Sequence, residues 1–163
     1  MRKMIKIAIL CIAAFVATNC GPNGGGENPL IKGVIGEWHL VESPLLNEDT
    51  ESILDIYVEF KSDNTLVLYQ KDINAPIYYN VYDGTYLING AVITGKYSDG
   101  KNWGASNGYK ASIDDQGRLT LINVDNGSDI SVYAPEVVPE EIKAGAVVMT
   151  TRGEEMFDIV RYL

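Results

Sequence analysis

From residue 32 onward, apolar and polar positions alternate with the period of two that is typical of β-strands. The pattern is clearest in residues 53–60: one face carries Leu54, Ile56, Val58 and Phe60, and the other carries Asp55, Tyr57 and Glu59. Short groups of Gly, Asn, Asp and Ser separate such runs. The pattern predicts eight strands, at 36–42, 53–60, 65–71, 77–88, 91–97, 109–113, 118–124 and 129–134.

The connections between these strands are short. Asn89 and Gly90 predict a type I′ hairpin turn, and Gly84 predicts a bend in the preceding strand. Pro139 and the two glutamates after it predict one short helix, because proline suits the first turn and acidic residues suit the positive end of the helix dipole. A meander of this kind usually hides its strand edges by closing on itself. We therefore predict an all-β, up-and-down antiparallel barrel with a short C-terminal helix at 139–144 and final strands at 147–151 and 157–163.

The beginning of the chain follows another pattern. Three basic residues precede an apolar run at 7–17 that is too short to span a bilayer, and Cys20 follows almost at once. This order is typical of a secretory signal peptide. The next residues, GPNGGGENP, are too rich in Gly and Pro to pack and predict a flexible linker. We expect a signal peptide at 1–19, an attachment cysteine and linker at 20–31, and one domain at 32–163.

Cys20 resembles the lipid-attachment site of bacterial lipoproteins, in which a type II signal peptidase cuts just before an acylated cysteine. Residues 17–19 (ATN) depart from that family's preferred box at the first and last positions. Ordinary signal peptidase cleavage fits less well, because no A-x-A triplet lies between Ala13 and Cys20. The other cysteine, Cys11, would leave with the signal. Acylation would then explain a lone thiol in an exported chain.

This resemblance implies a lipid-anchored protein of the cell envelope, expected in the outer membrane and facing the periplasm. Some Gram-negative lipoproteins reach the cell surface through an acidic run after the cysteine, and here only Glu27 is present. Removing residues 1–19 leaves 144 residues, with 10 Lys and Arg against 22 Asp and Glu. The resulting charge of −12 argues against nucleic acid as a partner, because phosphates repel it.

Signals of catalysis are sparse. Residues 104–108 (GASNG) match the G-x-S-x-G pattern of serine hydrolases, which requires a helix after Ser106. A strand is expected there instead, and the only histidine, His39, precedes the serine. A single histidine without nearby cysteines also fails to make a conventional zinc site. We expect no enzymatic activity, cofactor or metal, and we interpret His39 as a strand residue with hydrogen-bond partners.

The opening of the first strand, GEW at 36–38, resembles the Gly-x-Trp signature of lipocalins. The segments GEWHLV, IYVEFKSDNTLVLYQK, GTYLINGAVITGKYSDGKNWG, PEEIK and VRYL together resemble lipocalin-like lipoproteins of Gram-negative envelopes over 32–163. This resemblance implies an eight-stranded barrel with a cavity for a small apolar or amphipathic ligand. It also implies structural roles for Gly36 and Trp38 at the closed end, where Trp38 packs against an arginine, by position Arg161.

Aromatic side chains are the candidate ligand contacts. Beyond residue 19 the chain has ten Tyr and two Phe, and tyrosine combines an apolar face with a polar tip. Trp103 is the strongest candidate, because it lies in the loop 99–104 rather than on a strand; capping of the barrel is its alternative role. The remaining candidates, each of which also suits a half-buried strand surface, are Tyr57, Tyr69, Tyr86, Tyr97 and Tyr109.

Two functions remain open at this point. The first is non-covalent binding of a small apolar or amphipathic molecule inside the barrel of a lipid-anchored envelope protein. Small residues at Ala91, Gly95 and Ala111 favour open space for a ligand. The alternative is an envelope module that binds another protein or a glycan through its acidic surface. Its barrel would be filled by side chains, for which the strands supply enough apolar residues.

Overall fold

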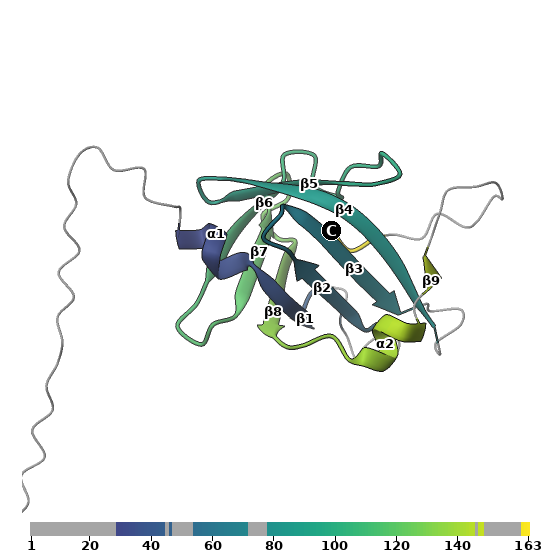
Figure 1. The fold of residues 1–163 in the computed structure, drawn as a ribbon. Coiled ribbons are helices and arrows are strands. Elements are labelled where there is room, and N and C mark those ends of the chain that lie inside the picture. The colour runs from purple at the N-terminus through teal and green to yellow at the C-terminus, as the bar shows by residue number, and fades with distance from the viewer. Residues whose placement is uncertain (1–28, 45, 47–53, 72–77, 146, 149–160) are drawn as a thin grey trace, which may run out of the picture.

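A closed, eight-stranded antiparallel barrel forms the body of the protein (Figure 1). The computed structural model describes residues 29–44, 46, 54–71, 78–145, 147–148 and 161–163. Each strand pairs with the next along the chain, and the first pairs with the eighth, so the ring closes. The strands are β1 (Gly36–Glu42), β2 (Ile56–Phe60), β3 (Thr65–Lys71), β4 (Tyr79–Asn89), β5 (Val92–Tyr97), β6 (Tyr109–Ile113), β7 (Leu119–Asn123) and β8 (Ile130–Pro135).

This architecture confirms the predicted up-and-down barrel with one short C-terminal helix. The predicted alternation also holds, since Ile56, Val58 and Phe60 of β2 all lie in the interior core. Register pairs between neighbouring strands keep the same face inside, for example Val58 of β2 with Leu68 of β3. A one-residue slip would move every interior side chain of a strand to the outside, so this buried face specifies the register.

The hairpin between β4 and β5 differs from its prediction by one residue. Asn89 pairs with Val92, so the two-residue turn consists of Gly90 and Ala91 rather than Asn89 and Gly90. Gly90 has a φ of 61°, and Asn89 has no positive φ. A positive φ at the first central residue alone is the pattern of type II′, which needs only one residue with glycine's freedom, whereas type I′ needs two.

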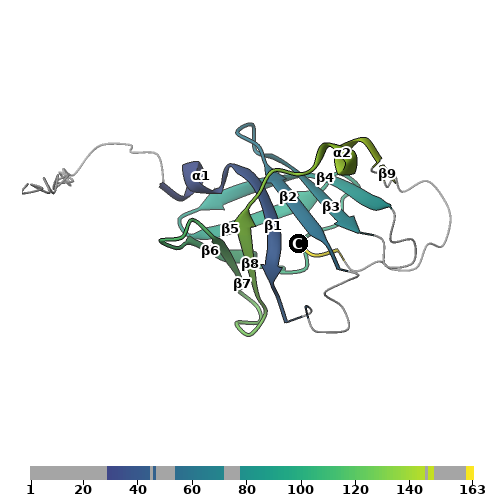
Figure 2. The ribbon, with the colours of Figure 1, turned by 90° about the horizontal axis from the view of Figure 1, so that it is seen from below.

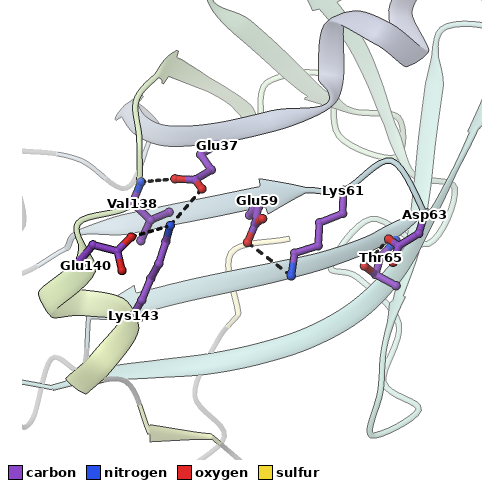
Figure 3. A network of polar contacts seen from close by, with 8 residues as sticks. All are labelled: Glu37, Glu59, Lys61, Asp63, Thr65, Val138, Glu140 and Lys143. Carbon is purple, nitrogen blue, oxygen red and sulfur yellow. Dashed lines mark hydrogen bonds and ion pairs between the residues drawn. The ribbon is translucent and has the colours of Figure 1, made fainter.

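Helix α2 (Glu140–Gly145) covers the outer face of β2, β3 and β4 (Figures 1 and 2). Its Ile142 and the preceding Val138 are buried against outward-facing side chains of these strands. Glu37 of β1 holds the same segment, because its carboxylate accepts a hydrogen bond from the Val138 amide at 2.5 Å and pairs with Lys143 at 3.1 Å (Figure 3). The predicted helix is thus present, shifted by one residue.

Helix α1 (Pro29–Val34) was not predicted. It lies beside β6 at one end of the barrel, where Val34 is buried (Figure 1). The indole Nε1 of Trp38 donates to the Val34 carbonyl at 2.8 Å. A six-residue segment containing Gly33 is too short to show helical periodicity, and isolated helices of this length are unstable. Tertiary contacts such as the Trp38 bond therefore hold α1.

Residues 161–163 run inside the barrel rather than along its sheet, and the C mark lies within the ring in both views (Figures 1 and 2). Leu163 is 1% exposed and belongs to the interior core, and Tyr97 Oη donates to its carbonyl at 2.9 Å. The prediction of a strand at 157–163 is therefore wrong for 161–163, since β1 and β8 already close the ring. Residues 157–160 lie outside the described residues. Of the strand predicted at 147–151, the structure describes β9 (Val147–Val148), which pairs in parallel with β4. Residues 149–151 lie outside the described residues.

Candidate functional site

Four of the six aromatic side chains predicted to contact a ligand meet inside the barrel. Tyr86 of β4, Tyr97 of β5 and Tyr109 of β6 are all buried in the interior core. Trp103, from the loop between β5 and β6, joins them. Edge-on aromatic contacts link this group to Phe60, whose ring centroid lies 5.0 Å from that of Tyr86 and 6.4 Å from that of Trp103. The interior therefore has an aromatic wall.

The other two candidates, Tyr57 and Tyr69, lie on the opposite side of the barrel wall. They are register partners on β2 and β3 and are buried in the outer cluster beneath Val138 and Ile142. The pleat of each strand explains this placement, because Tyr57 and Tyr69 are next in sequence to the inward-facing Val58 and Leu68. Their assignment to a site inside the barrel is therefore corrected.

Trp103 fills a weak place in the ring. β5 and β6 share only two register pairs, Val92 with Lys110 and Ile93 with Tyr109. Beyond these pairs the loop between the strands meets β5 through the isolated Lys96–Asn102 bridge, and its Trp103 side chain is buried in the interior core at 3% exposure. Its ring lies against Gly95, where a Cβ atom would come within 2.0 Å of the indole Cε2. Trp103 thus closes the gap where β5 and β6 separate, which we call the β5–β6 seam.

An open depression of about 290 Å³ lies at the same place. Its lining combines hydroxyl, amide and ammonium groups with one exposed apolar side chain, Leu87. Gly95 belongs both to this depression and to the contact with Trp103. The lining residues are Thr85, Tyr86, Leu87, Thr94, Gly95, Lys96, Asn102, Ala105 and Ser106.

Arg161 enters the barrel interior but does not contact Trp38 as predicted. Its guanidinium lies over the rings of Tyr82 and Tyr97, with 4.5 Å and 4.7 Å to the ring centroids, and pairs with Asp99 at 2.5 Å. The hydrogen bond from Arg161 holds the pKa of Asp99 below its ordinary value. The carboxylate and the two rings offer Arg161 a better environment than Trp38, whose indole is engaged by α1.

Some buried polar atoms of the interior have no hydrogen-bond partner among the described residues. They include Trp103 Nε1, Tyr133 Oη and Arg161 Nη1. Tyr133, on β8, is 0% exposed, and this burial raises the pKa of its phenol. Buried polar groups without partners are uncommon in folded proteins and call for an explanation.

A second polar cluster lies on the outer face, and no sequence signal pointed to its partners. His39 Nε2 bonds to Asp55 at 2.8 Å, and His39 Nδ1 bonds to Glu136 at 3.0 Å. Tyr79 donates to the other oxygen of Asp55, and the His39 ring stacks on Tyr57 with 4.3 Å between centroids. This agrees with the interpretation of His39 as a strand residue with hydrogen-bond partners.

The electrostatics of this outer cluster favour the charged forms of its ion pair. The hydrogen bond to Asp55 raises the pKa of His39, against the opposing effect of burial. Burial alone would raise the pKa of Asp55, but hydrogen bonds from His39 and Tyr79 lower it overall. With both ring nitrogens engaged by carboxylates, His39 joins β1 to Asp55, just before β2, and to Glu136, just after β8. The arrangement is that of a structural tie.

The G-x-S-x-G segment lacks the geometry of a nucleophile elbow. Ser106 is exposed at the depression, and β6 begins at Tyr109, so a strand follows where the hydrolase motif requires a helix. In the part of the chain that the structure describes, no group of three or more His, Cys, Asp or Glu side chains is placed to hold a metal ion. No helix within the described ranges is long and apolar enough to cross a membrane.

A family model described as the lipocalin-like domain matches residues 34–129 of the chain. The match runs from the end of α1 through β7 and covers more than half of the sequence. The chain belongs to the lipocalin-like domain family. A search of curated proteins finds no match. In this lipocalin-like domain, the wall of Tyr86, Tyr97, Trp103 and Tyr109 is the part of the interior that adjoins the β5–β6 seam.

Proposed function

We propose that this lipocalin-like domain binds a small apolar or amphipathic molecule non-covalently inside its barrel. The observation that carries the proposal is the meeting of Tyr86, Tyr97, Trp103 and Tyr109 in the interior beside the β5–β6 seam. Aromatic walls with a few polar groups are typical of small-molecule sites. The seam supplies a route, because opening it breaks few strand-to-strand hydrogen bonds.

Binding rather than catalysis is part of the same proposal. The lipocalin-like fold is consistent with carriage of small hydrophobic ligands. The His39–Asp55 pair lies on the outer face of β1 and β2, away from the interior, and both groups already have protein partners. The interior side chains that we assign to ligand binding are all aromatic. No pair of carboxylates is among them.

The proposal places the domain in the cell envelope, anchored by a lipid on Cys20. Support for this part comes from the sequence alone, since Cys20 lies outside the described residues. A chain acylated at Cys20 would carry the barrel on the segment that ends at α1. Several acyl chains would give stable anchoring, whereas one chain gives only reversible binding.

One observation favours the alternative function, a protein- or glycan-binding module. The interior is well filled, since Tyr133, Phe60 and Leu163 are all at most 1% exposed. A ligand would therefore require side chains beside the β5–β6 seam to shift and make room for it. A module of the alternative kind would use its acidic surface and leave the interior closed.

Native mass spectrometry of the protein expressed from the full chain and purified from the envelope in detergent distinguishes the two functions. We expect a stoichiometric additional mass that disappears on denaturation, which would identify the class of ligand. A protein that carries no additional mass and takes up no apolar probe would contradict binding in the barrel. Chemical cross-linking in whole cells would then test the alternative function.

A further inference from the structure

We propose that the interior site selects ligands that present an uncharged hydrogen-bond acceptor, such as a ketone, ester or ether oxygen. This inference rests on the proposed function, because it specifies the chemistry of the molecule bound inside the barrel. It is carried by buried donor groups that the protein itself leaves without partners: Trp103 Nε1–H, Tyr133 Oη–H and Arg161 Nη1–H.

The two tryptophans of the chain provide an internal comparison. Both indoles are buried in the same interior core. Trp38 Nε1 donates to the Val34 carbonyl at 2.8 Å, whereas Trp103 Nε1 has no partner among the described residues. An indole nitrogen can only donate a hydrogen bond, so any group that pairs with Trp103 Nε1–H must be an acceptor.

The tyrosines show the same contrast. Tyr97 Oη donates to the carbonyl of Leu163 at 2.9 Å, while Tyr133 Oη is fully enclosed and lacks a partner. Tyr133 lies on β8, between Leu40 of β1 and Leu119 of β7, which both present apolar side chains. A buried hydroxyl without a partner loses its hydration and gains nothing in return, so an acceptor in reach of it would bind favourably.

The charge of the interior argues for an uncharged acceptor. Arg161 is a part-buried cation of this region, and its Nη2 already pairs with Asp99, while its enclosed Nη1 has no partner among the described residues. The pair has no net charge, and its guanidinium is held between Tyr82 and Tyr97. An anionic ligand would meet the Asp99 carboxylate without an unpaired cation to compensate, whereas a neutral oxygen needs only the free donor.

Three probes of equal carbon number test this selectivity on the protein made from the full chain: methyl pentyl ketone, heptylammonium and heptanoate. The ketone can only accept hydrogen bonds, heptylammonium can only donate them, and heptanoate is an anionic acceptor. We expect the ketone to bind about tenfold more tightly than heptylammonium and more tightly than heptanoate, because each satisfied buried donor favours it.

Nuclear magnetic resonance supplies a readout at a single atom. The two indole N–H signals are assigned with Trp38→Phe and Trp103→Phe. The ketone should move the Trp103 signal downfield, as a new hydrogen bond does, and leave the Trp38 signal in place. If heptylammonium binds as tightly as the ketone, or if the Trp103 signal does not move, the inference is wrong while ligand binding stands. If no probe binds, the proposed function fails as well.

Matched variants separate hydrogen bonding from packing. Trp103→Phe keeps an aromatic ring at the seam but removes the donor, so the preference for ketone over heptylammonium should fall several-fold. Trp38→Phe removes an indole donor that is already satisfied, and the preference should be unchanged. Tyr133→Phe provides a second test if the tryptophan variant does not fold, because it removes only a hydroxyl. An unchanged preference in Tyr133→Phe and Trp103→Phe would overturn the inference.

Discussion

The indole of Trp103 packs directly on Gly95, in a space where no Cβ atom fits. A Cβ at Gly95 would approach Trp103 Cε2 to 2.0 Å, so any larger residue forces the ring or the strand to move. The absence of a side chain at Gly95 of β5 and the buried indole of Trp103 are therefore complementary parts of the β5–β6 seam.

Gly95→Ala should displace Trp103 and destabilise the protein by about 1–3 kcal/mol, the usual cost of overpacking a core. Urea unfolding measures the loss, and a red shift of tryptophan emission reports the displaced ring. Gly127→Ala is the matched control, because a Cβ at Gly127 has nothing within 4 Å. It should change stability by less than about 0.5 kcal/mol. Equal effects in both variants would contradict the close packing.

The outer cluster predicts a pH-dependent stability. The pKa of His39 is raised above 6.5, so its contribution is complete below pH 6.5 and is lost as the pH rises through the folded-state pKa. The pKa of Asp55 is lowered below 3.8, so its contribution is present above pH 3.8 and is lost as the pH falls through the folded-state pKa. The cluster should therefore stabilise most between pH 3.8 and 6.5.

His39→Gln should flatten the alkaline side of this profile. Urea unfolding at several pH values would show the wild-type free energy of unfolding fall above pH 6.5 relative to the variant. We expect a difference of at most about 1 kcal/mol, because the cluster is partly exposed and solvent screens it. Parallel profiles for the two proteins would show that His39 does not gain a proton-dependent interaction on folding.

Glu37→Ala should loosen α2 from the barrel. The change removes the acceptor for the Val138 amide and the partner of Lys143, and charged hydrogen bonds of this kind contribute about 1.5–3 kcal/mol (Figure 3). Hydrogen exchange in α2 and urea unfolding measure the effect. Glu59→Ala is the control, since its contact with Lys61 is a longer pair at 3.6 Å. A similar loss in both variants would refute the tie through Glu37.

Asp99→Ala should destabilise the protein by about 1.5–3 kcal/mol, because it removes the charged hydrogen bond of the part-buried Arg161 guanidinium. The double variant Asp99→Ala/Arg161→Met should recover part of this loss, since no unpaired charge remains. A double-mutant cycle from unfolding curves gives the coupling energy of the pair. Additive losses in the cycle would mean that the two residues do not act together.

Cys20→Ala should release the protein from the membrane fraction, since it removes the proposed site of acylation. Fractionation of cells and detection of the barrel by antibody measure the change. Cys11→Ala is the control, because Cys11 lies in the predicted signal peptide and is not the attachment site. A membrane fraction that is unchanged in Cys20→Ala would exclude a lipid anchor at this residue.

The strands were predictable because the pleat determines which side chains share a face. Alternation in β2 placed Ile56, Val58 and Phe60 together, and the same alternation placed Tyr57 on the outside. The error of assigning Tyr57 to the interior site came from treating tyrosines as a group instead of applying the strand period to each one. For Tyr57 and Tyr69 the correct side of the barrel was therefore deducible from the sequence.

Other features depend on contacts that no local pattern records. Helix α1 is held by the bond between Trp38 and Val34 and by packing at the end of the barrel, so its six residues show no signal alone. Arg161 was assigned to Trp38 by its position near the end of the chain. Its actual neighbours, Tyr82, Tyr97 and Asp99, come together only in the folded barrel.

The pairing of β1 with β8 affects how the protein can fold during its synthesis. Trp38 pairs with Pro135, so about a hundred residues of chain must exist before this contact can form. Every other pair of adjacent strands in the ring is consecutive in the sequence and can form while the chain is still being synthesised. We therefore expect the nascent protein to pass through an open sheet with two unpaired edge strands before β1 and β8 meet. Chaperones that shield strand edges have their opportunity to act in that interval.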